Sequence, residues 1–403
     1  MGTNAQQQDT RPPGQGPLQG VKFLKQIFHL LKRLAPAGCE RDTAGNRRLL
    51  YSQYASLILL GLFNPTMQSL RGLSELSRLK KVQKILGGGK ASIGSLSESV
   101  RVFDPALLED IFHELRASLP DATASPTGGL IPQELMQRLQ AVDGSALRAL
   151  PQIVHAIGEG KWRLHLQLEV QRNLPAQARL TRDEIGGEAD ERNVLAGMLQ
   201  SRRIYILDRG YERYHLMQQI VTAQSDYVLR VQTRSLRVME SRPLSAEATT
   251  AGILSDDLVQ PGKSRPEVAA VTHPVRRIIL TETGPRRRRT DRPASSQVVL
   301  LTSLTELPAE LIAAIYRLRW SIELFFKFFK HVLGCRQLLS HRDPGVAIQI
   351  YCGLIAALLL SLASGQSVGR RGFELICLFL QGWADEEELV AGLQRLTRAQ
   401  KQN

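Results

Sequence analysis

A strict alternation of apolar and polar residues between Trp162 and Val170 is the feature that most constrains the fold of this chain. The apolar positions are Trp162, Leu164, Leu166, Leu168 and Val170, and they alternate with Arg163, His165, Gln167 and Glu169. A period of two predicts a β-strand with one buried face. Residues 178–181, which follow a break at Asn173–Pro175, are the candidate partner strand.

Other segments of the chain alternate between strand-like and helix-like patterns. The apolar run 204–207 predicts a buried central strand that ends at Asp208, and a helix is expected before it at about 191–199. Further strands are expected at 227–231, 275–280 and 298–301, a long helix at about 308–333, and more helices over 345–400. Strands and helices mixed in this way predict an α/β protein.

The first third of the chain has a different character. Residues 1–20 are polar and rich in Gln, Pro and Gly, which predicts a disordered tail. Residues 21–120 have helical periodicity with basic residues between the apolar ones, and Gly87–Gly89 and Pro105 divide them into short helices. Such a module either binds DNA with its basic faces or packs as a helical domain with solvated lysines.

The segment from Tyr316 to Lys330 forms an amphipathic helix on a helical wheel. At 100° per residue, one face of about 100° of arc collects one carboxylate, three cations and two aromatic rings. These residues are Tyr316, Arg319, Trp320, Glu323, Lys327 and Lys330. One interpretation is a solvated face in which Glu323 and Lys327 form an i,i+4 pair. The other is a surface that stacks bases and binds phosphates, because aromatic rings lie among the cations.

Charge and cysteine content narrow the class of partner and the compartment. The 403 residues carry a formal net charge of +14, which favours a polyanionic partner such as nucleic acid. Four cysteines without a CxxC pair are typical of reduced packing residues in a cytoplasmic protein.

The N-terminus has no apolar signal-peptide region, and the apolar run 350–362 is too short to span a membrane. We therefore expect no membrane partner.

The spacing of Tyr316, Arg319, Glu323 and Lys330, Y-x2-R-x3-E-x6-K, resembles the signature of the insertion-sequence-four (IS-four) family of DDE transposases. Two further segments resemble the acidic motifs of that family. Ala141–Ser145 resembles the strand that ends in the first Asp, here Asp143, and Ile206–Tyr211 resembles the second motif, with Asp208. Taken alone, the pair Asp143-Gly144 is also typical of a turn. The three acids follow in the expected order, 65 and 115 residues apart. The resemblance covers about residues 130–345.

The resemblance implies a ribonuclease-H-like catalytic core with a β-rich insertion, flanked by N- and C-terminal helical regions. The expected division is a tail at 1–20, a helical region at 21–128, a catalytic domain at 129–345 with its insertion at about 227–305, and helices at 346–403. It also implies that Asp143, Asp208 and Glu323 are the catalytic residues and hold Mg²⁺, with Mn²⁺ as a substitute. Mg²⁺ suits such a site because it prefers hard oxygen ligands.

The implied partner is double-stranded DNA, both as element ends and as target. Tyr316, Arg319, Trp320, Lys327 and Lys330 would contact it, with Trp320 stacking on a base flipped out near the cut. The implied reaction is hydrolysis of a phosphodiester at the element end, followed by strand transfer. Joining two ends in a synaptic complex is compatible with a homodimer, by analogy alone.

Two alternative functions remain open at this stage. One is a ribonuclease-H-like nuclease without strand transfer, and the other is a catalytically inactive relative that only binds DNA. No ATP site is implied, because neither Gly87–Lys90 nor Gly262–Ser264 has the spacing of a P-loop. The basic run Arg286–Arg289 either follows a DNA backbone or is a solvated loop.

Overall fold

The structure is a computed structural model of the whole chain, and it describes most of the residues between 29 and 401. The described residues are 29–34, 42, 45, 47–64, 69–119, 130–148, 161–182, 187–232, 236–260, 271–281, 297–331, 333–335, 338–364, 370–380 and 382–401. The predicted tail 1–20 and the run Arg286–Arg289 lie outside the described residues.

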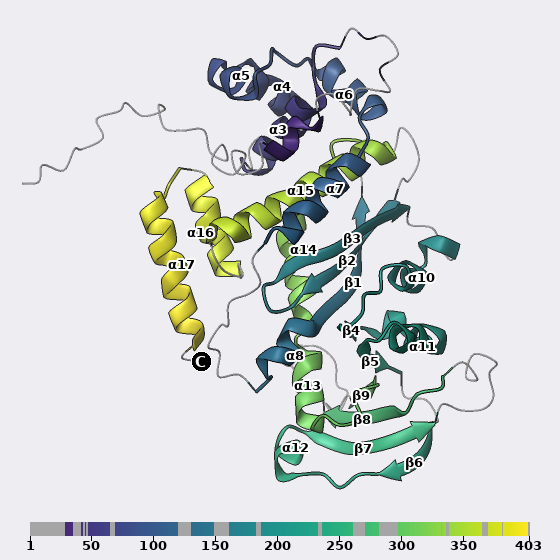
Figure 1. The fold of residues 1–403 in the computed structure, drawn as a ribbon. Coiled ribbons are helices and arrows are strands. Elements are labelled where there is room, and N and C mark those ends of the chain that lie inside the picture. The colour runs from purple at the N-terminus through teal and green to yellow at the C-terminus, as the bar shows by residue number, and fades with distance from the viewer. Residues whose placement is uncertain are drawn as a thin grey trace, which may run out of the picture.

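Helices and strands follow one another along the chain in a mixed order (Figure 1). The helices are α3 (Tyr51–Leu62), α4 (Leu70–Arg78), α5 (Lys80–Leu86), α6 (Ile93–Val102), α7 (Ala106–Ala117), α8 (Gln133–Arg138), α10 (Glu191–Ala196), α11 (Tyr214–Thr222), α12 (Ala246–Thr250), α13 (Ala309–Arg317), α14 (Trp320–His331), α15 (Asp343–Ser364), α16 (Arg370–Leu380) and α17 (Glu386–Lys401), with short 3₁₀ helices η2 (Gly187–Ala189) and η3 (Arg209–Tyr211). The strands are β1 (Leu139–Arg148), β2 (Lys161–Glu169), β3 (Leu174–Arg182), β4 (Ile204–Leu207), β5 (Asp226–Val231), β6 (Arg237–Ser241), β7 (Ile253–Gln260), β8 (Val275–Thr281) and β9 (Gln297–Thr302).

The described strands form one sheet in the order β3-β2-β1-β4-β5-β9-β8-β7-β6. The pairs β1–β4 and β4–β5 are parallel, and the remaining pairs are antiparallel. Strands β5–β9, which fall in the predicted insertion at about 227–305, continue the same sheet, because β5 pairs with β4 and β9 pairs with β5. The fold is therefore a mixed α/β protein with a large, mostly antiparallel sheet.

Helices cover both faces of the central strands. On one face, leucines of β2 pack with α14 and α15, and Ile206 and Val228 pack with α13. On the opposite face, Leu207 and Leu229 pack with α10 and α11. Figure 1 shows α10 and α11 on one side of the sheet and α13, α14 and α15 on the other. Three layers are the outcome expected for strands that are apolar on both faces.

The N-terminal helices and α15 form the other large part of the apolar core. Helix α5 ends at Gly87, whose φ of 63° is left-handed, and α7 begins directly after Pro105, as the sequence predicts. Helix α15 includes a stretch of 19 residues, Asp343–Ser361, that is long and apolar enough to cross a membrane. That stretch is 83% buried inside the protein, which identifies α15 as a core helix.

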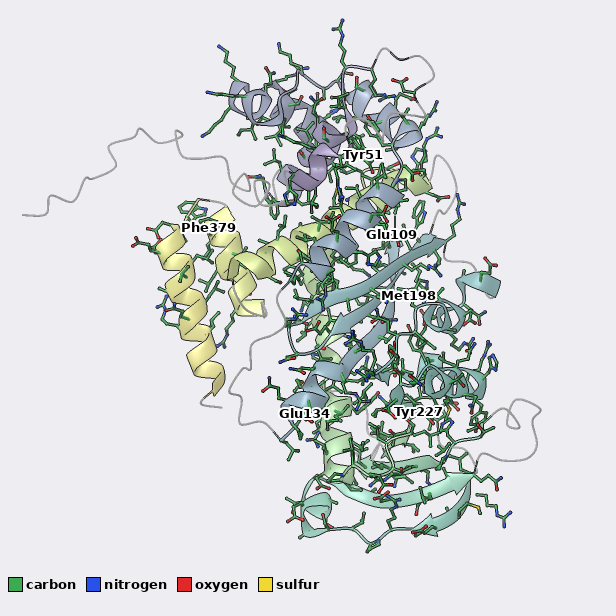
Figure 2. The ribbon with its side chains drawn as sticks, in the orientation of Figure 1. Tyr51, Glu109, Glu134, Met198, Tyr227 and Phe379 are labelled. Atoms are coloured by element: carbon green, nitrogen blue, oxygen red, sulfur yellow. The ribbon has the colours of Figure 1, made fainter. Side chains whose placement is uncertain are left out.

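Three local predictions need correction. Asp143 neither ends a strand nor lies in a turn, because β1 continues to Arg148 and pairs along its length with β2. The polar face of β2 is buried too: His165 bonds Thr181, and Gln167 donates to the carbonyl of Met198, labelled in Figure 2. The expected helix 308–333 is two helices, α13 and α14, interrupted at Leu318–Arg319.

Candidate active site

Asp143 and Asp208 come together because β1 and β4 are parallel neighbours. The register pairs Leu139 with Ile204 and Ala141 with Ile206. Continued by two residues, it places Asp143 beside Asp208 on strands that lie about 4.8 Å apart. Both residues fall on the face covered by α13 and α14, because Ala141 and Ile206, two residues earlier in each strand, pack on that face.

The two aspartates have the same local hydrogen bond. Asp143 Oδ1 accepts a bond of 2.8 Å from the backbone N–H of Gly144, and Asp208 Oδ1 accepts one of 2.7 Å from the backbone N–H of Arg209. Asp208 also caps the 3₁₀ helix Arg209–Tyr211 that follows β4. Each carboxylate is therefore oriented by its own backbone, and its second oxygen is left for other partners.

Glu323 lies in the first turn of α14 and is bound by Arg319. Nη2 of Arg319 donates to Oε1 of Glu323 at 2.5 Å, and the Arg319 side chain is only 14% exposed. Arg319 lies four residues before Glu323, in the break between α13 and α14, where the backbone N–H groups of Leu318 and Arg319 bond to carbonyls three residues back. The solvated-face interpretation of the sequence predicts Lys327 as the partner of Glu323; the partner in the structure is Arg319.

The electrostatics link these groups into one cluster. Burial raises the pKa of Asp143 to about 6, and the charges of Glu191 and Asp208 also raise it, whereas Gly144 N–H and Arg319 lower it. The charge of Arg319 also interacts with Asp208, Glu323 and Tyr316. One guanidinium therefore lies within electrostatic reach of all three predicted acids and supplies part of their counter-charge.

The donor chemistry of this cluster fits a hard divalent cation. Carboxylate oxygens from β1, the end of β4 and α14 are the ligands that Mg²⁺ prefers, and a cation beside Asp143 would offset the cost of its buried charge. In the part of the chain that the structure describes, no three His, Cys, Asp or Glu side chains are arranged to hold a metal ion. Glu323 is bound to Arg319, so it would have to leave that pair to join the two aspartates.

The other predicted site residues divide into exposed and bound groups. Trp320 is 57% exposed, and Lys327 is exposed on the same helix. Tyr316 is half-buried, and burial raises the pKa of its hydroxyl, which lies beside Arg319. Lys330 donates from Nζ to the carbonyl of Ala146 at 2.8 Å, so it ties α14 to β1.

Sequence reasoning missed two charged residues beside the aspartates. Glu191 begins α10 and forms an ion pair with Arg163 of β2. Arg163 is part of the polar half of the alternating pattern, which predicts a solvated face, and Glu191 is one of two adjacent acids at a helix start. These two residues come close to Asp143 only because α10 packs on the sheet face opposite to α14. No local sequence pattern could reveal this proximity.

Comparison with known proteins gives a consistent result. The family described as "Transposase DDE domain" matches residues 135–359. The inferred transposase y4zB of Sinorhizobium fredii is 30% identical over 171 residues, which cover 41% of this chain and 44% of that protein. The inferred transposase InsL of insertion sequence element IS186A in Escherichia coli K12 is 27% identical over 342 residues, 78% of this chain and 86% of that protein.

A further relative supports the same grouping. The transposase for insertion sequence element IS421 of Escherichia coli is 27% identical over 312 residues, which cover 68% of this chain and 80% of that protein. The matched region 135–359 runs from α8 to α15 and includes Asp143, Asp208 and Glu323. It spans more than half of the chain. The chain therefore belongs to the transposase DDE domain family.

Proposed function

We propose that this protein is an insertion-sequence transposase of the IS-four family, which cuts DNA at the ends of its element and joins them to a target. The observation that carries the proposal is the pairing of β1 with β4, which places Asp143 beside Asp208 on the face covered by α13 and α14. Its support is the family match over residues 135–359 and relatives named as insertion-sequence transposases.

In the proposed mechanism, Asp143, Asp208 and Glu323 would hold Mg²⁺, with Mn²⁺ as a substitute. Bound there, the cation would stabilise the negative charge that develops on a phosphodiester during cleavage. Arg319 exchanges Glu323 for a DNA phosphate, which a guanidinium binds through two parallel hydrogen bonds. That exchange would free the Glu323 carboxylate to join the two aspartates.

Four further side chains act on DNA in this proposal. Trp320, which is 57% exposed, stacks on a base beside the cut, a contact worth about 1–3 kcal/mol. Lys327 is exposed one turn beyond Glu323 and contacts phosphate as a point charge. Tyr316, which lies beside Arg319, and Lys330, which bonds Ala146 in this structure, contact phosphates at the DNA end. The enzyme acts in the cytoplasm, as a homodimer that joins two ends.

The N-terminal helical region, residues 21–128, contributes DNA binding. Its exposed basic residues on and around α4 and α5 are Arg71, Arg78, Lys80, Lys81, Lys84 and Lys90. Glu75 is the acidic residue within that stretch, and it pairs with Arg78 at 3.6 Å. The excess of positive charge is suited to a phosphate backbone.

The experiment uses a labelled duplex taken from the DNA that flanks the gene, a target plasmid and Mg²⁺ or Mn²⁺. We expect joined product with the wild-type protein and no cleavage with Asp208→Asn, which should still shift the duplex in a gel. Glu134→Gln is the matched control, since Glu134 is an exposed acid of α8 (Figure 2). Cleavage without joining would identify a nuclease. A gel shift of the duplex without cleavage would identify a DNA-binding relative. Cleavage by Asp208→Asn would refute the proposed site.

A further inference from the structure

Glu191 approaches the two aspartates from the far face of the sheet. A Cβ atom added to Gly144 would lie 2.6 Å from Oε1 of Glu191, and one added to Gly210 would lie 3.7 Å from Oε2. The carboxylate therefore occupies the space beside two glycines, one directly after Asp143 and one two residues after Asp208. A Cβ atom at Gly144 would displace it, whereas one at Gly210 would make ordinary van der Waals contact with it.

A set of hydrogen bonds and ion pairs holds Glu191 in this place. Asp190 caps α10 through a bond of 2.9 Å from the backbone N–H of Arg192, and its carboxylate also pairs with that side chain. Arg163, on β2, pairs with the Glu191 carboxylate, whose side chain is 22% exposed. A charged pair this enclosed has a defined geometry, unlike a pair of exposed surface ions.

The carboxylate of Glu191 carries a negative charge beside Gly144, the residue that follows Asp143. It also raises the pKa of the Tyr211 hydroxyl, which is buried next to Gly210 and is influenced by Asp143 and Asp208 as well. Glu191 thus combines a steric contact with both aspartate segments and a negative charge directed at the same place.

We propose that Glu191, held by Arg163, is a positioning residue of the active site: it supports the Asp143–Gly144 and Asp208–Gly210 segments and strengthens their attraction for a divalent cation. This role rests on the proposed function, because it concerns the same cation site. Glu191 does not itself touch the cation, since it lies on the α10 side of the sheet and the aspartates lie on the α14 side.

Substitutions of Glu191 and of Arg163 should have opposite effects on cation affinity. Glu191→Gln keeps the shape of the side chain and removes a negative charge, so we expect affinity to fall about three- to ten-fold. Arg163→Met removes the compensating positive charge, so affinity should rise by a similar factor. A purely structural pair would weaken binding in both variants, because either substitution breaks the same contact.

Gly144→Ala tests whether the position of the Glu191 charge matters. The added methyl would meet Oε1 of Glu191 at 2.6 Å and push the carboxylate aside without changing the charge of the protein. We expect it to lower cation affinity in the wild-type background and to have a smaller effect in the Glu191→Gln background, because the group displaced there has the same shape but no charge. Equal effects in both backgrounds would contradict a link through Glu191.

The measurement is a Mn²⁺ titration of the full-length protein at about pH 8 without DNA, followed by the electron paramagnetic resonance signal of free Mn²⁺. Glu188→Gln is the matched control, because Glu188 is an exposed acid three residues before Glu191. The proposal is supported if Mn²⁺ affinity falls in Glu191→Gln, rises in Arg163→Met and does not change in Glu188→Gln. It is overturned if Mn²⁺ affinity is unchanged in Glu191→Gln, or if it falls in both Glu191→Gln and Arg163→Met.

Two further outcomes separate this inference from the proposed function. If wild-type protein binds no Mn²⁺, or if Asp208→Asn binds it equally well, the proposed cation site itself fails and the role of Glu191 fails with it. If Asp208→Asn abolishes binding while Glu191→Gln does not change it, only the role of Glu191 fails. Should Glu191→Gln not fold, Arg163→Met decides: tighter binding supports the proposal, and unchanged or weaker binding overturns it.

Discussion

At the scale of single residues, Asp143 is a carboxylate whose charge the fold disfavours. Burial, with Glu191 and Asp208 nearby, raises its pKa to about 6, while Gly144 N–H and Arg319 offset this in part. An acid whose pKa is higher in the folded than in the unfolded state destabilises the fold when ionised. This destabilisation is expected when acids are buried close together and no cation is bound.

Asp143→Asn should therefore stabilise the protein while it abolishes activity. The difference from the ordinary Asp pKa of about 3.9 corresponds to about 3 kcal/mol, and solvent screening of this partly exposed group reduces the expected gain to about 1–2 kcal/mol. Because the folded state binds the extra proton at Asp143, the unfavourable contribution of this residue to stability disappears as the pH falls from about 6 to about 4. The gain in free energy of unfolding is measured by urea denaturation in the presence of EDTA at about pH 7.5. When the measurement is repeated near about pH 4, the gain should shrink towards zero. A gain that does not depend on pH would contradict this prediction.

At the scale of elements, an apolar face and a hydrogen bond from Lys330 hold α14 on the sheet. Ile322, Phe325, Phe326 and Phe329 are buried, as the helical pattern predicts. Lys330 Nζ bonds the carbonyl of Ala146 near the end of β1. This contact joins the helix that carries Glu323 to the strand that carries Asp143.

Lys330→Met should therefore lower stability, whereas Lys327→Met should not. Loss of a bond from a charged donor to a partly buried carbonyl costs about 1–3 kcal/mol, and an exposed substitution changes stability by less than about 0.5 kcal/mol. The two lysines lie three residues apart on one helix, so they are matched controls for each other. Urea denaturation followed by circular dichroism measures both; equal effects would show that the contact to Ala146 contributes nothing to stability.

At the scale of the whole molecule, the sheet joins the predicted insertion to the predicted catalytic core. Arg276 of β8 is 3% exposed; it pairs with Asp256 of β7 and donates to the carbonyls of Leu304, Thr305 and Leu307, just before α13. The strands beyond β5 are thereby fixed to the chain that leads into α13 and α14. The N-terminal helices lie at the other end of the molecule (Figure 1). Their exposed basic residues lie on and around α4 and α5.

If these basic residues bind DNA, removing two of their charges should weaken duplex binding and its dependence on salt. Each phosphate contact contributes about 0.9 to the slope of log K against log salt, so Lys80→Ala with Lys84→Ala should reduce the slope by about 2. Arg395→Ala, an exposed cation of α17, is the control and should leave the slope unchanged. Fluorescence anisotropy with a labelled duplex measures the slope. An unchanged slope in the double variant would show that α4 and α5 do not bind DNA.

Local sequence patterns determined the elements of this protein and the order of its acids. Alternation at 162–170 and the apolar run 204–207 predict β2 and β4, and Gly87 and Pro105 mark helix ends correctly, because backbone geometry and face polarity are local properties. The tertiary structure alone decided that Arg319 rather than Lys327 pairs with Glu323, and that α13 and α14 are separate helices. It alone placed Glu191 beside the glycines that follow the two aspartates. These features depend on contacts that form only when the layers pack, and no local period records which partners the packing brings together.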